Sequence, residues 1–214
     1  DLSANGILEL LRDGKNIALI SDAGYPLIND PGQKIVTLAT SEGFNVVPVS
    51  GPSAFLNALV ASGLVAQPFI FIGFLPQSHS DRVKKLKEYE NYPMTMIFYE
   101  APHRIEKCLK DCMEVFGDRK MTLARELTKM HEEFLRGTIS EILDVVDELR
   151  GEMVIVMDGN HEDKTKAIDM NTIIEMVNVS VENGMSTKDA VKDAAKKTGI
   201  SKNRIYDAVN SNRN

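Results

Sequence analysis

The chain has 214 residues, of which 43% are hydrophobic and 26% are charged, and its formal net charge is −6. This length is enough for one large domain or for two small ones, each with a buried core. No apolar run is long enough to cross a bilayer, and the first residues lack the regions of a secretory signal, so composition speaks against a membrane or exported protein and predicts a cytoplasmic one.

The charges are unevenly distributed. Residues 1–160 carry 16 Lys and Arg against 23 Asp and Glu, whereas residues 161–214 carry 9 against 8. An acidic body binds nucleic acid poorly, so an RNA partner has to be met by local basic patches. Two patches qualify: Arg82, Lys84, Lys85 and Lys87; and Lys196, Lys197, Lys202 and Arg204. A solvated helix face is the simpler interpretation of the first patch, and both interpretations stay open for the second.

The first predicted elements are a helix and a strand that leads into a turn-rich loop. Residues 7–11 have the apolar spacing of a helix face, and an apolar run predicts a strand over residues 17–21. The loop SDAGYPLINDPG follows. Glycine lets the backbone approach a ligand and proline fixes φ without using a donor, so the loop has the character of a cofactor site. Since the chain starts at Asp1 and enters a helix almost at once, we expect it to be part of a longer polypeptide.

A second strand and loop repeat this arrangement. A helix is predicted over residues 33–42 and a strand over residues 45–49, after which a Ser-Gly-Pro turn opens a helix over residues 53–62. The free amides of Ser53 and Ala54 at that helix N-terminus favour ligand oxygens or a carboxylate. Such turns also follow strands in proteins that bind nothing, so this loop alone decides little.

Strands and helices continue to alternate in the second half of the chain. Strands are expected over residues 69–72, 95–99, 121–125, 133–136 and 153–157. Helices are expected over residues 80–90, 103–116 and 140–149. The alternation predicts two α/β domains with mainly parallel and mixed sheets, joined near residues 65–67.

Charged side chains follow two of these strands. Glu100, His103 and Arg104 come directly after the strand at residues 95–99, and the carboxyl end of a strand is where α/β sheets place ligands. The segment RELTKMHEE, which starts at Arg125, is denser in charge. Alone it is best interpreted as a solvated edge.

If the charged segment faces the same cleft as the loops, its side chains acquire roles. Arg125 or Lys129 then holds a phosphate, while Glu126 or Glu132 accepts a proton. The common nucleotide-binding and hydrolase signatures, G-x-x-x-x-G-K-[ST], G-x-G-x-x-G and G-x-S-x-G, do not occur. Four scattered histidines and two cysteines give no metal-ligand spacing, so no metal is expected.

The C-terminal part is predicted to be a separate helical unit. Residues 161–170 are polar and aperiodic, which indicates a linker. Residues 171–214 contain three amphipathic stretches separated at Gly184 and Gly199, an arrangement similar to a helix-turn-helix domain. Nucleic-acid contact and a role in oligomerisation or capping both stay open.

Six sequence blocks, taken together, resemble one family. In order they read SDAGYPLINDPG, VPVSGPSAFLNALVASGL, FIFIGFLPQ, IFYEAPHRI, VFGDRKMTLARELTKMHEEFLRGT and GEMVIVMDG. Over roughly residues 15–160 they resemble the bacterial small-subunit ribosomal RNA (cytidine-2′-O)-methyltransferases, a branch of the tetrapyrrole methylase family of class III S-adenosylmethionine methyltransferases. The helical tail is similar to an extra C-terminal domain found in part of that family.

The resemblance implies a fold, a cofactor and a substrate. It implies two α/β domains, residues 1–66 and 67–160, flanking an S-adenosylmethionine cleft, usually in a homodimer. It also implies methylation of the ribose 2′-hydroxyl of a cytidine in small-subunit ribosomal RNA, naked or in the assembled subunit. By motif position the cofactor residues are Asp22, Gly24 and Tyr25; Gly51, Ser53 and Ala54; and Tyr99, Arg125 and Leu127.

The sequence departs from the family pattern at three points. The family begins with a glycine-rich strand and loop and then an acidic Glu-Asp-Thr-Arg motif, and neither occurs here. Those elements would supply a central strand of the first domain and part of the RNA-facing cleft. Tyr25 stands where a smaller residue is usual, and Ser50 replaces the usual proline.

Methyl transfer to an alcohol is an in-line displacement, so positioning does most of the catalysis. We expect Glu126 or Glu132 to accept the hydroxyl proton, and Lys129 and Arg104, with His103 beside them, to hold the RNA.

Two other functions stay open. A precorrin-type tetrapyrrole methylase would share the cofactor loops but needs neither basic patches nor a helical tail. A non-enzymatic nucleic-acid-binding protein would act through residues 161–214 with salt-sensitive affinity. A fold that binds no cofactor is the plainest alternative.

Overall fold

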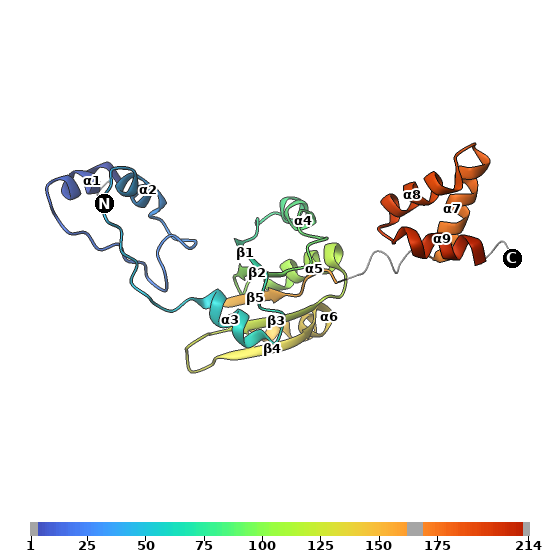
Figure 1. Ribbon diagram of the computed structural model, residues 1–214. Helices are drawn as coiled ribbons and strands as arrows, with labels where there is room; N and C mark the ends of the chain where they lie inside the picture. Colours follow the sequence, from blue (N-terminus) through green and yellow to red (C-terminus); the bar gives the residue numbers. More distant parts are fainter. Residues whose placement is uncertain (1–3, 162–168, 212–214) are drawn as a thin grey trace. The chain divides into compact units, whose positions relative to one another are not determined.

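The computed structural model describes residues 4–161 and 169–211. The chain divides into two compact units, Asp1–Asn160 and His161–Asn214, which are described separately (Figure 1). The predicted linker falls largely on residues 162–168, which lie outside the described residues. Among the helices that the structure describes, none has the length and apolar character to span a bilayer.

The first unit is a mixed α/β fold, which confirms the predicted fold class, whereas its division into domains at residues 1–66 and 67–160 stays a prediction. Its helices are α1 (Ala4–Arg12), α2 (Gln33–Ser41), α3 (Ala54–Ser62), α4 (His79–Lys87), α5 (Ile105–Phe116), α6 (Ile139–Leu143) and the 3₁₀ turn η1 (Val146–Glu148). Its strands are β1 (Phe69–Phe74), β2 (Thr95–Glu100), β3 (Lys120–Arg125), β4 (Glu133–Thr138) and β5 (Met153–Met157), in the order β1-β2-β5-β3-β4. The β1–β2 pair is parallel and the others are antiparallel, which confirms the mixed sheet.

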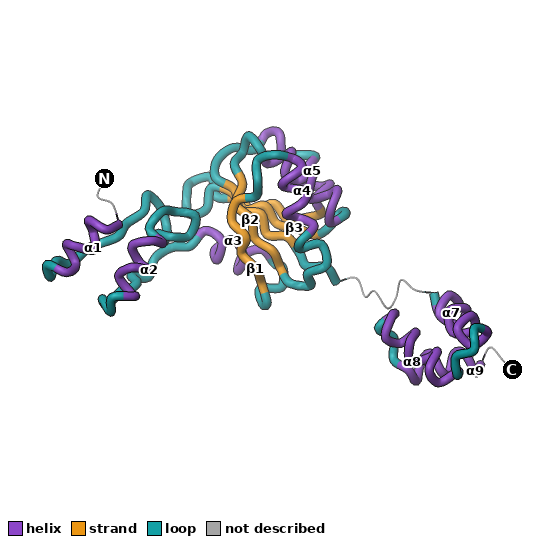
Figure 2. The backbone as a smooth tube through the Cα atoms, turned by 90° about the horizontal axis from the view of Figure 1, so that it is seen from above, coloured by secondary structure: helices purple, strands orange, loops and turns teal. Residues whose placement is uncertain are grey.

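The sheet is the middle of three layers (Figure 2). Residues of β2 and β5 are almost all buried, and alternate side chains point to opposite faces. On one face Phe98 and Ile155 join the core with α4, α5 and α6. On the other face Ile97 and Val154 pack on α3. Burial of both faces explains why these strands read as continuous apolar runs.

Helix α3 is tied to the sheet at its C-terminal end. Arg136 of β4 donates from Nη2 to the Ala61 carbonyl oxygen at 2.6 Å and from Nε to that of Ser62 at 3.3 Å. The Thr122 hydroxyl of β3 donates to the same Ser62 oxygen at 2.9 Å. These donors satisfy carbonyl groups that the end of a helix leaves without partners. The opposite end of α3 therefore has a fixed position relative to the sheet.

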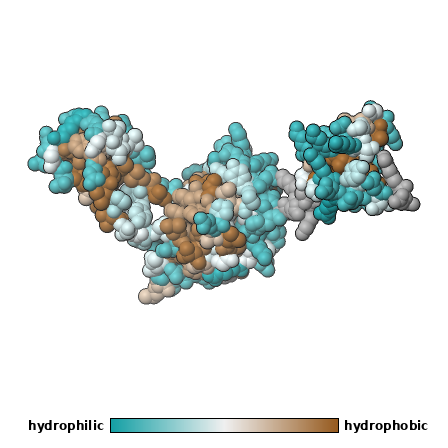
Figure 3. All heavy atoms as spheres, in the orientation of Figure 1, coloured by the Kyte–Doolittle hydropathy of each residue, from teal (hydrophilic) through white to brown (hydrophobic). Residues whose placement is uncertain are grey.

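The prediction of strands over residues 17–21 and 45–49 is wrong. Neither segment is paired in the described part of the chain, and their apolar side chains remain on the surface, with Ile20 84% and Val49 85% exposed. Figure 3 shows apolar surface in the segment before α3 and around α3 itself. A strand needs a hydrogen-bonding neighbour, and the apolar pattern of one segment does not supply it.

The helices predicted for this unit are confirmed to within a few residues, except the one over residues 140–149. That segment forms α6, which Thr138 caps by accepting a hydrogen bond from the Glu141 amide, and then the separate turn η1. The break falls after Asp144, next to the β-branched residues Val145 and Val146, which are poor helix formers.

The second unit consists of α7 (Met170–Glu182), α8 (Thr187–Thr198) and α9 (Lys202–Ser211). The Ser186 hydroxyl caps α8 by accepting from the Asp189 amide, and Gly199 ends α8 in the left-handed conformation, as predicted. Ile173, Val191 and Ile205, one from each helix, meet in a core of its own.

Candidate functional site

The loops that stood out in the sequence converge on one cavity of about 480 Å³. Its wall comes from within residues 23–30 and 52–57, from residues 99–102 and 127–129, and from residues 152–154. Of the predicted site residues, Gly24, Tyr25, Ser53, Ala54, Tyr99, Leu127 and Lys129 line it. All these segments belong to the first unit. Their convergence makes this cavity the candidate site.

The first two loops are joined by a hydrogen bond. The Tyr25 hydroxyl oxygen accepts from the Gly51 amide at 3.0 Å. Gly24 has φ 72, a left-handed conformation that favours glycine, and a Cβ there would be in ordinary contact with the Pro52 carbonyl oxygen, 3.4 Å away. Asp22 lies in the first loop beside these residues. Gly51 thus does not line the cavity itself but helps to hold Tyr25, which does, in place.

The N-terminus of α3 opens on the cavity. Ser53 is extended, and its side chain makes no capping hydrogen bond in the described structure. The first amides of a helix have no intrahelical acceptor and lie at the positive end of the helix dipole. Ala54 and Asn57 of α3 also line the cavity. This part of the wall suits a carboxylate or another oxygen-rich group.

An aromatic wall faces the loops. Tyr99 packs edge-on against Phe71 and Phe74, with ring centroids 5.0 Å and 5.6 Å away. Burial raises the pKa of the Tyr99 phenol; a hydrogen bond from the Phe55 amide opposes this rise, and the nearby Asp30 carboxylate adds to it. The phenol is therefore neutral at physiological pH, and the wall offers flat apolar surface to a ring.

Lys129 extends into the cavity region between two carboxylates. Its Nζ lies 3.0 Å from Glu126 Oε1 and 3.0 Å from Glu152 Oε2, and Glu126 Oε1 also accepts from the Glu152 amide at 2.9 Å. Hydrogen bonds to Glu152 and Glu126 raise the pKa of Lys129, whereas those from the Glu152 amide and Lys129 lower the pKa of Glu126. Both groups are therefore ionised at neutral pH.

Two further predicted site residues, Glu132 and Arg125, stabilise the connection between β3 and β4. Glu132 Oε2 accepts from the Thr128 amide at 2.7 Å. Arg125 Nε donates to Glu133 Oε2 at 2.5 Å, and its Nη1 donates to the Arg150 carbonyl oxygen at 3.3 Å. The side chains of Glu132 and Arg125 thus bond to residues at the β3–β4 connection and, through Arg150, to the loop before β5, next to the cavity.

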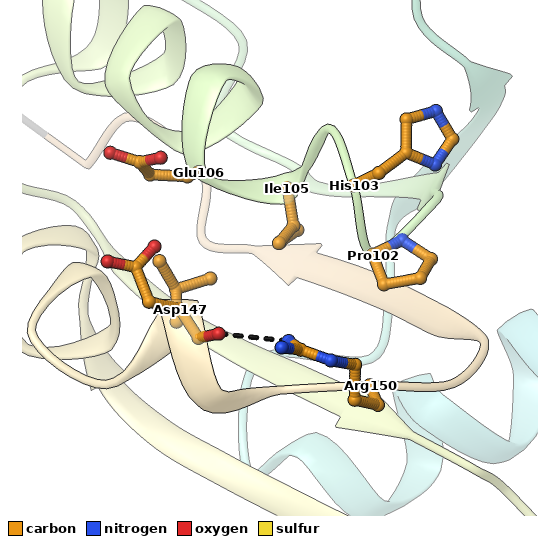
Figure 4. Close-up of a pocket in the computed structure, with 7 residues that line it drawn as sticks. Pro102, His103, Ile105, Glu106, Asp147 and Arg150 are labelled. Atoms are coloured by element: carbon orange, nitrogen blue, oxygen red, sulfur yellow. Dashed lines mark hydrogen bonds between the residues drawn. The ribbon is translucent and has the colours of Figure 1, made fainter.

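Arg104 and His103 are positioned differently from each other. The Arg104 guanidinium donates to the Leu75 carbonyl oxygen at 3.0 Å and to the buried Glu100 carboxylate at 3.2 Å. This cation is thus committed to the protein interior. His103 lines a second pocket of about 400 Å³ (Figure 4), and Pro102 belongs to the lining of both this pocket and the cavity.

Sequence reasoning missed several lining residues. Phe74 lies two residues beyond the predicted end of its strand, and Glu152 directly precedes β5. Asn57 lies one turn into α3. Glu152 lies at the cavity because β5 pairs with β2, which leads into the Glu100 loop, and no local sequence signal showed this pairing. Asn57 had no local signal either.

A buried ion pair between Arg82 and Asp111 links the first basic patch to a cluster of possible metal ligands. Arg82 is 3% exposed and donates from Nε to Asp111 Oδ2 at 2.6 Å, so it does not belong to the basic surface predicted for it. His79 Nδ1 lies 2.9 Å from the other oxygen of Asp111, and Glu114 lies close by. Since Asp111 already binds Arg82 and His79, we assign no metal to this cluster.

The family model for tetrapyrrole (corrin/porphyrin) methylases matches residues 3–143. The chain belongs to this family. Curated relatives cover nearly all of it. The "Ribosomal RNA small subunit methyltransferase I" of Bacillus subtilis (strain 168) is 43% identical over 212 residues, which are 96% of this chain and 73% of that protein. The protein of the same name from Halalkalibacterium halodurans is 38% identical over 205 residues, or 94% of this chain and 71% of that protein.

Solved structures of tetrapyrrole methylases share the fold. The methyltransferase CobJ superposes with a TM-score of 0.56 at 18% identity, covering 73% of this chain and 70% of CobJ. The cobalt precorrin-4 methyltransferase CbiF gives 0.51 at 17% identity, covering 72% and 69%. At such identities the likeness concerns the fold alone. Methyltransferases of this family use S-adenosylmethionine as methyl donor.

Proposed function

We propose that this chain is an S-adenosylmethionine-dependent methyltransferase that acts on the ribose 2′-hydroxyl of a cytidine in small-subunit ribosomal RNA. The observation that carries the proposal is the convergence of the family's cofactor loops on the cavity of about 480 Å³. The names of relatives at 36–43% identity give the substrate class.

The residues of the cavity fit the methyl donor. The amides of Ser53 and Ala54 at the start of α3 suit its carboxylate, and the Tyr99 wall suits its adenine. Gly24 lets the backbone come close. We assign Asp22, Tyr25 and Gly51 to the same loops, and Arg125 and Leu127 to the side next to the β3–β4 connection. When bound, the sulfonium supplies an activated methyl group.

The chain's own residues position the nucleophile. Lys129, held protonated by Glu126 and Glu152, binds an RNA phosphate at the cavity. Glu126 or Glu132 accepts the hydroxyl proton late in the reaction. His103 contacts the substrate from the neighbouring loop, and Arg104, instead of making the substrate contact expected for it, holds that loop in place through its bond to Glu100.

Other parts of the proposal concern assembly and RNA contact. We infer that the protein works as a homodimer in the cytoplasm on the RNA or the assembled small subunit. The second unit contributes affinity through Lys196, Lys202 and Arg204, which are exposed where α8 ends and α9 begins. Sedimentation analysis of the protein would test the dimer.

Methyl transfer to ribosomal RNA tests the function. The protein is incubated with labelled S-adenosylmethionine and either small-subunit RNA or assembled subunits. The product is then mapped by resistance of the modified linkage to alkaline hydrolysis, which requires a free 2′-hydroxyl. Methylation of a precorrin in place of RNA would establish the alternative tetrapyrrole activity. RNA binding without transfer would favour the non-enzymatic alternative.

A further inference from the structure

The second pocket joins an apolar floor to charged side chains. Its volume of about 400 Å³ is in the range of small-ligand sites. Ile105 and Val146 are buried in its floor. Figure 4 shows the carboxyl groups of Glu106 and Asp147 at one end of the pocket and the Arg150 side chain extending across it. The pocket is therefore polar at its edge and apolar beneath, as a flat heteroaromatic ring requires.

The charged groups retain hydrogen-bonding capacity. In the described residues the Asp147 carboxylate accepts no hydrogen bond, although Lys110 interacts with it electrostatically. Arg150 uses Nη1 to donate to the carbonyl oxygens of Asp147 at 2.9 Å and Leu149 at 2.7 Å, and its Nε and Nη2 have no partner among the described residues. Lys110 Nζ donates to Glu106 Oε1 at 2.5 Å and lowers the pKa of Glu106, so this carboxylate is ionised and keeps its other oxygen as an acceptor. The pocket thus presents acceptors at one end and donors beside them.

This pattern matches one pyrimidine better than the other. Cytosine carries an amino donor next to two ring acceptors, and acidic side chains accept from that amino group in nucleic-acid complexes. Uracil has a carbonyl oxygen in place of the amino group, and a carboxylate facing it would be repelled. A guanidinium donates to the ring acceptors of cytosine. Phosphate alone is a poor ligand, because two carboxylates stand at the end of the pocket.

We propose that this pocket takes the base of the nucleotide that is methylated, with Asp147 and Glu106 accepting from the cytosine amino group and Arg150 donating to the ring. The inference rests on the proposed function. Pro102 lines both hollows, so a ribose at the mouth of the cavity has its own base next to the pocket. Enzymes that modify nucleotides commonly read a base that has left its stack in this way.

The test compares cytidine with uridine at the methylated position. Two otherwise identical transcripts are methylated by the protein and by its Asp147→Asn and Glu106→Gln variants. We expect the wild-type protein to favour cytidine by about tenfold or more in kcat/KM. The variants should lose several-fold of this preference, because their amides can donate to the uracil carbonyl. Asp144→Asn is the matched control, since Asp144 is exposed on the same segment outside the pocket.

Affinity for S-adenosylmethionine, measured by calorimetry, should stay unchanged in all variants and shows that they are folded. Wild-type preference in both pocket variants would overturn the inference and leave the proposed function intact. Absence of transfer by the wild-type protein would instead defeat the proposed function. In that case filter binding of the two transcripts still decides the pocket, since a preference for cytidine that Asp147→Asn abolishes supports it and an equal affinity overturns it.

Discussion

The hydroxyl of Tyr25 accepts a hydrogen bond from the amide of Gly51 at 3.0 Å, and this contact joins two loops that lie 26 residues apart in the chain. Tyr25→Phe removes the acceptor and leaves the ring. A hydrogen bond of this kind contributes about 0.5–1.5 kcal/mol, so we expect affinity for S-adenosylmethionine to fall by about two- to tenfold. Calorimetric titration measures it. Tyr206→Phe, at an exposed position in the second unit, should have no effect, and equal affinities for all three proteins would contradict the role of the contact.

Lys129→Glu should abolish most RNA methylation. The substitution places a third carboxylate beside Glu126 and Glu152 and removes the cation that we assign to the RNA phosphate. We expect at least a tenfold loss of methyl transfer, about the effect of losing one charge-assisted contact. Radiolabel incorporation into small-subunit RNA measures it. Lys87→Glu, exposed on α4, is the control with the same change in charge. Unchanged methylation in Lys129→Glu would remove this residue from the site.

Glu126→Gln should change how stability depends on pH. Hydrogen bonds from the Glu152 amide and Lys129 lower the pKa of Glu126 in the folded protein. A lowered pKa means that the ionised group stabilises the fold above the ordinary glutamate range, and that this stabilisation is lost as the pH falls through the lowered value. The wild-type Tm should therefore exceed that of the variant at pH 7, and the difference should shrink on acidification below about pH 4. A difference that is constant with pH would show that the charge has no part in it.

Gly73→Ala tests how the first cofactor loop is seated on β1. Gly73 has φ 78, and a Cβ there would lie 2.5 Å from Asn29 Oδ1. Gly63 is the matched control, since it has φ 82 and no described atom within 4 Å of such a Cβ. Gly63→Ala should cost only the left-handed conformation, about 1–2 kcal/mol in denaturant unfolding. Gly73→Ala should cost more and should also weaken S-adenosylmethionine binding. Equal effects of the two variants would mean that the contact with Asn29 does not matter.

Lys202→Gln combined with Arg204→Gln tests the RNA contact of the second unit. Both side chains are exposed on α9. Loss of two phosphate contacts should weaken RNA binding and lower the slope of log affinity against log salt by about two. Fluorescence anisotropy at several salt concentrations measures the slope. Lys188→Gln, at the start of α8, serves as the control. An unchanged slope would favour a purely structural unit.

Local sequence signals predicted most of the elements. The buried strands β2 and β5 read as apolar runs, and the glycine at position 199 marked the end of α8. The glycine- and proline-rich loops marked the cavity, because their residues let the backbone turn tightly and approach a ligand. These features depend on neighbours in the sequence, so a single chain reveals them.

The errors concern contacts between residues far apart in the sequence. Residues 17–21 and 45–49 have the composition of strands, but pairing depends on a neighbour that composition does not show. Arg82 was interpreted as surface charge, although its partner Asp111 lies 29 residues away. Arg104 is likewise held by Leu75 and Glu100. A charge pattern gives the sign of a side chain and says nothing about which group neutralises it.

Helix α3 connects the cavity with the sheet. Its first turn lines the cavity, and its last carbonyl groups are held by Arg136 and Thr122. A ligand bound at the first turn of α3 therefore also stabilises the packing of this helix on the sheet. Ligand binding should thus raise the temperature at which residues 4–160 unfold together, because a ligand that binds only the native state shifts the unfolding equilibrium towards it.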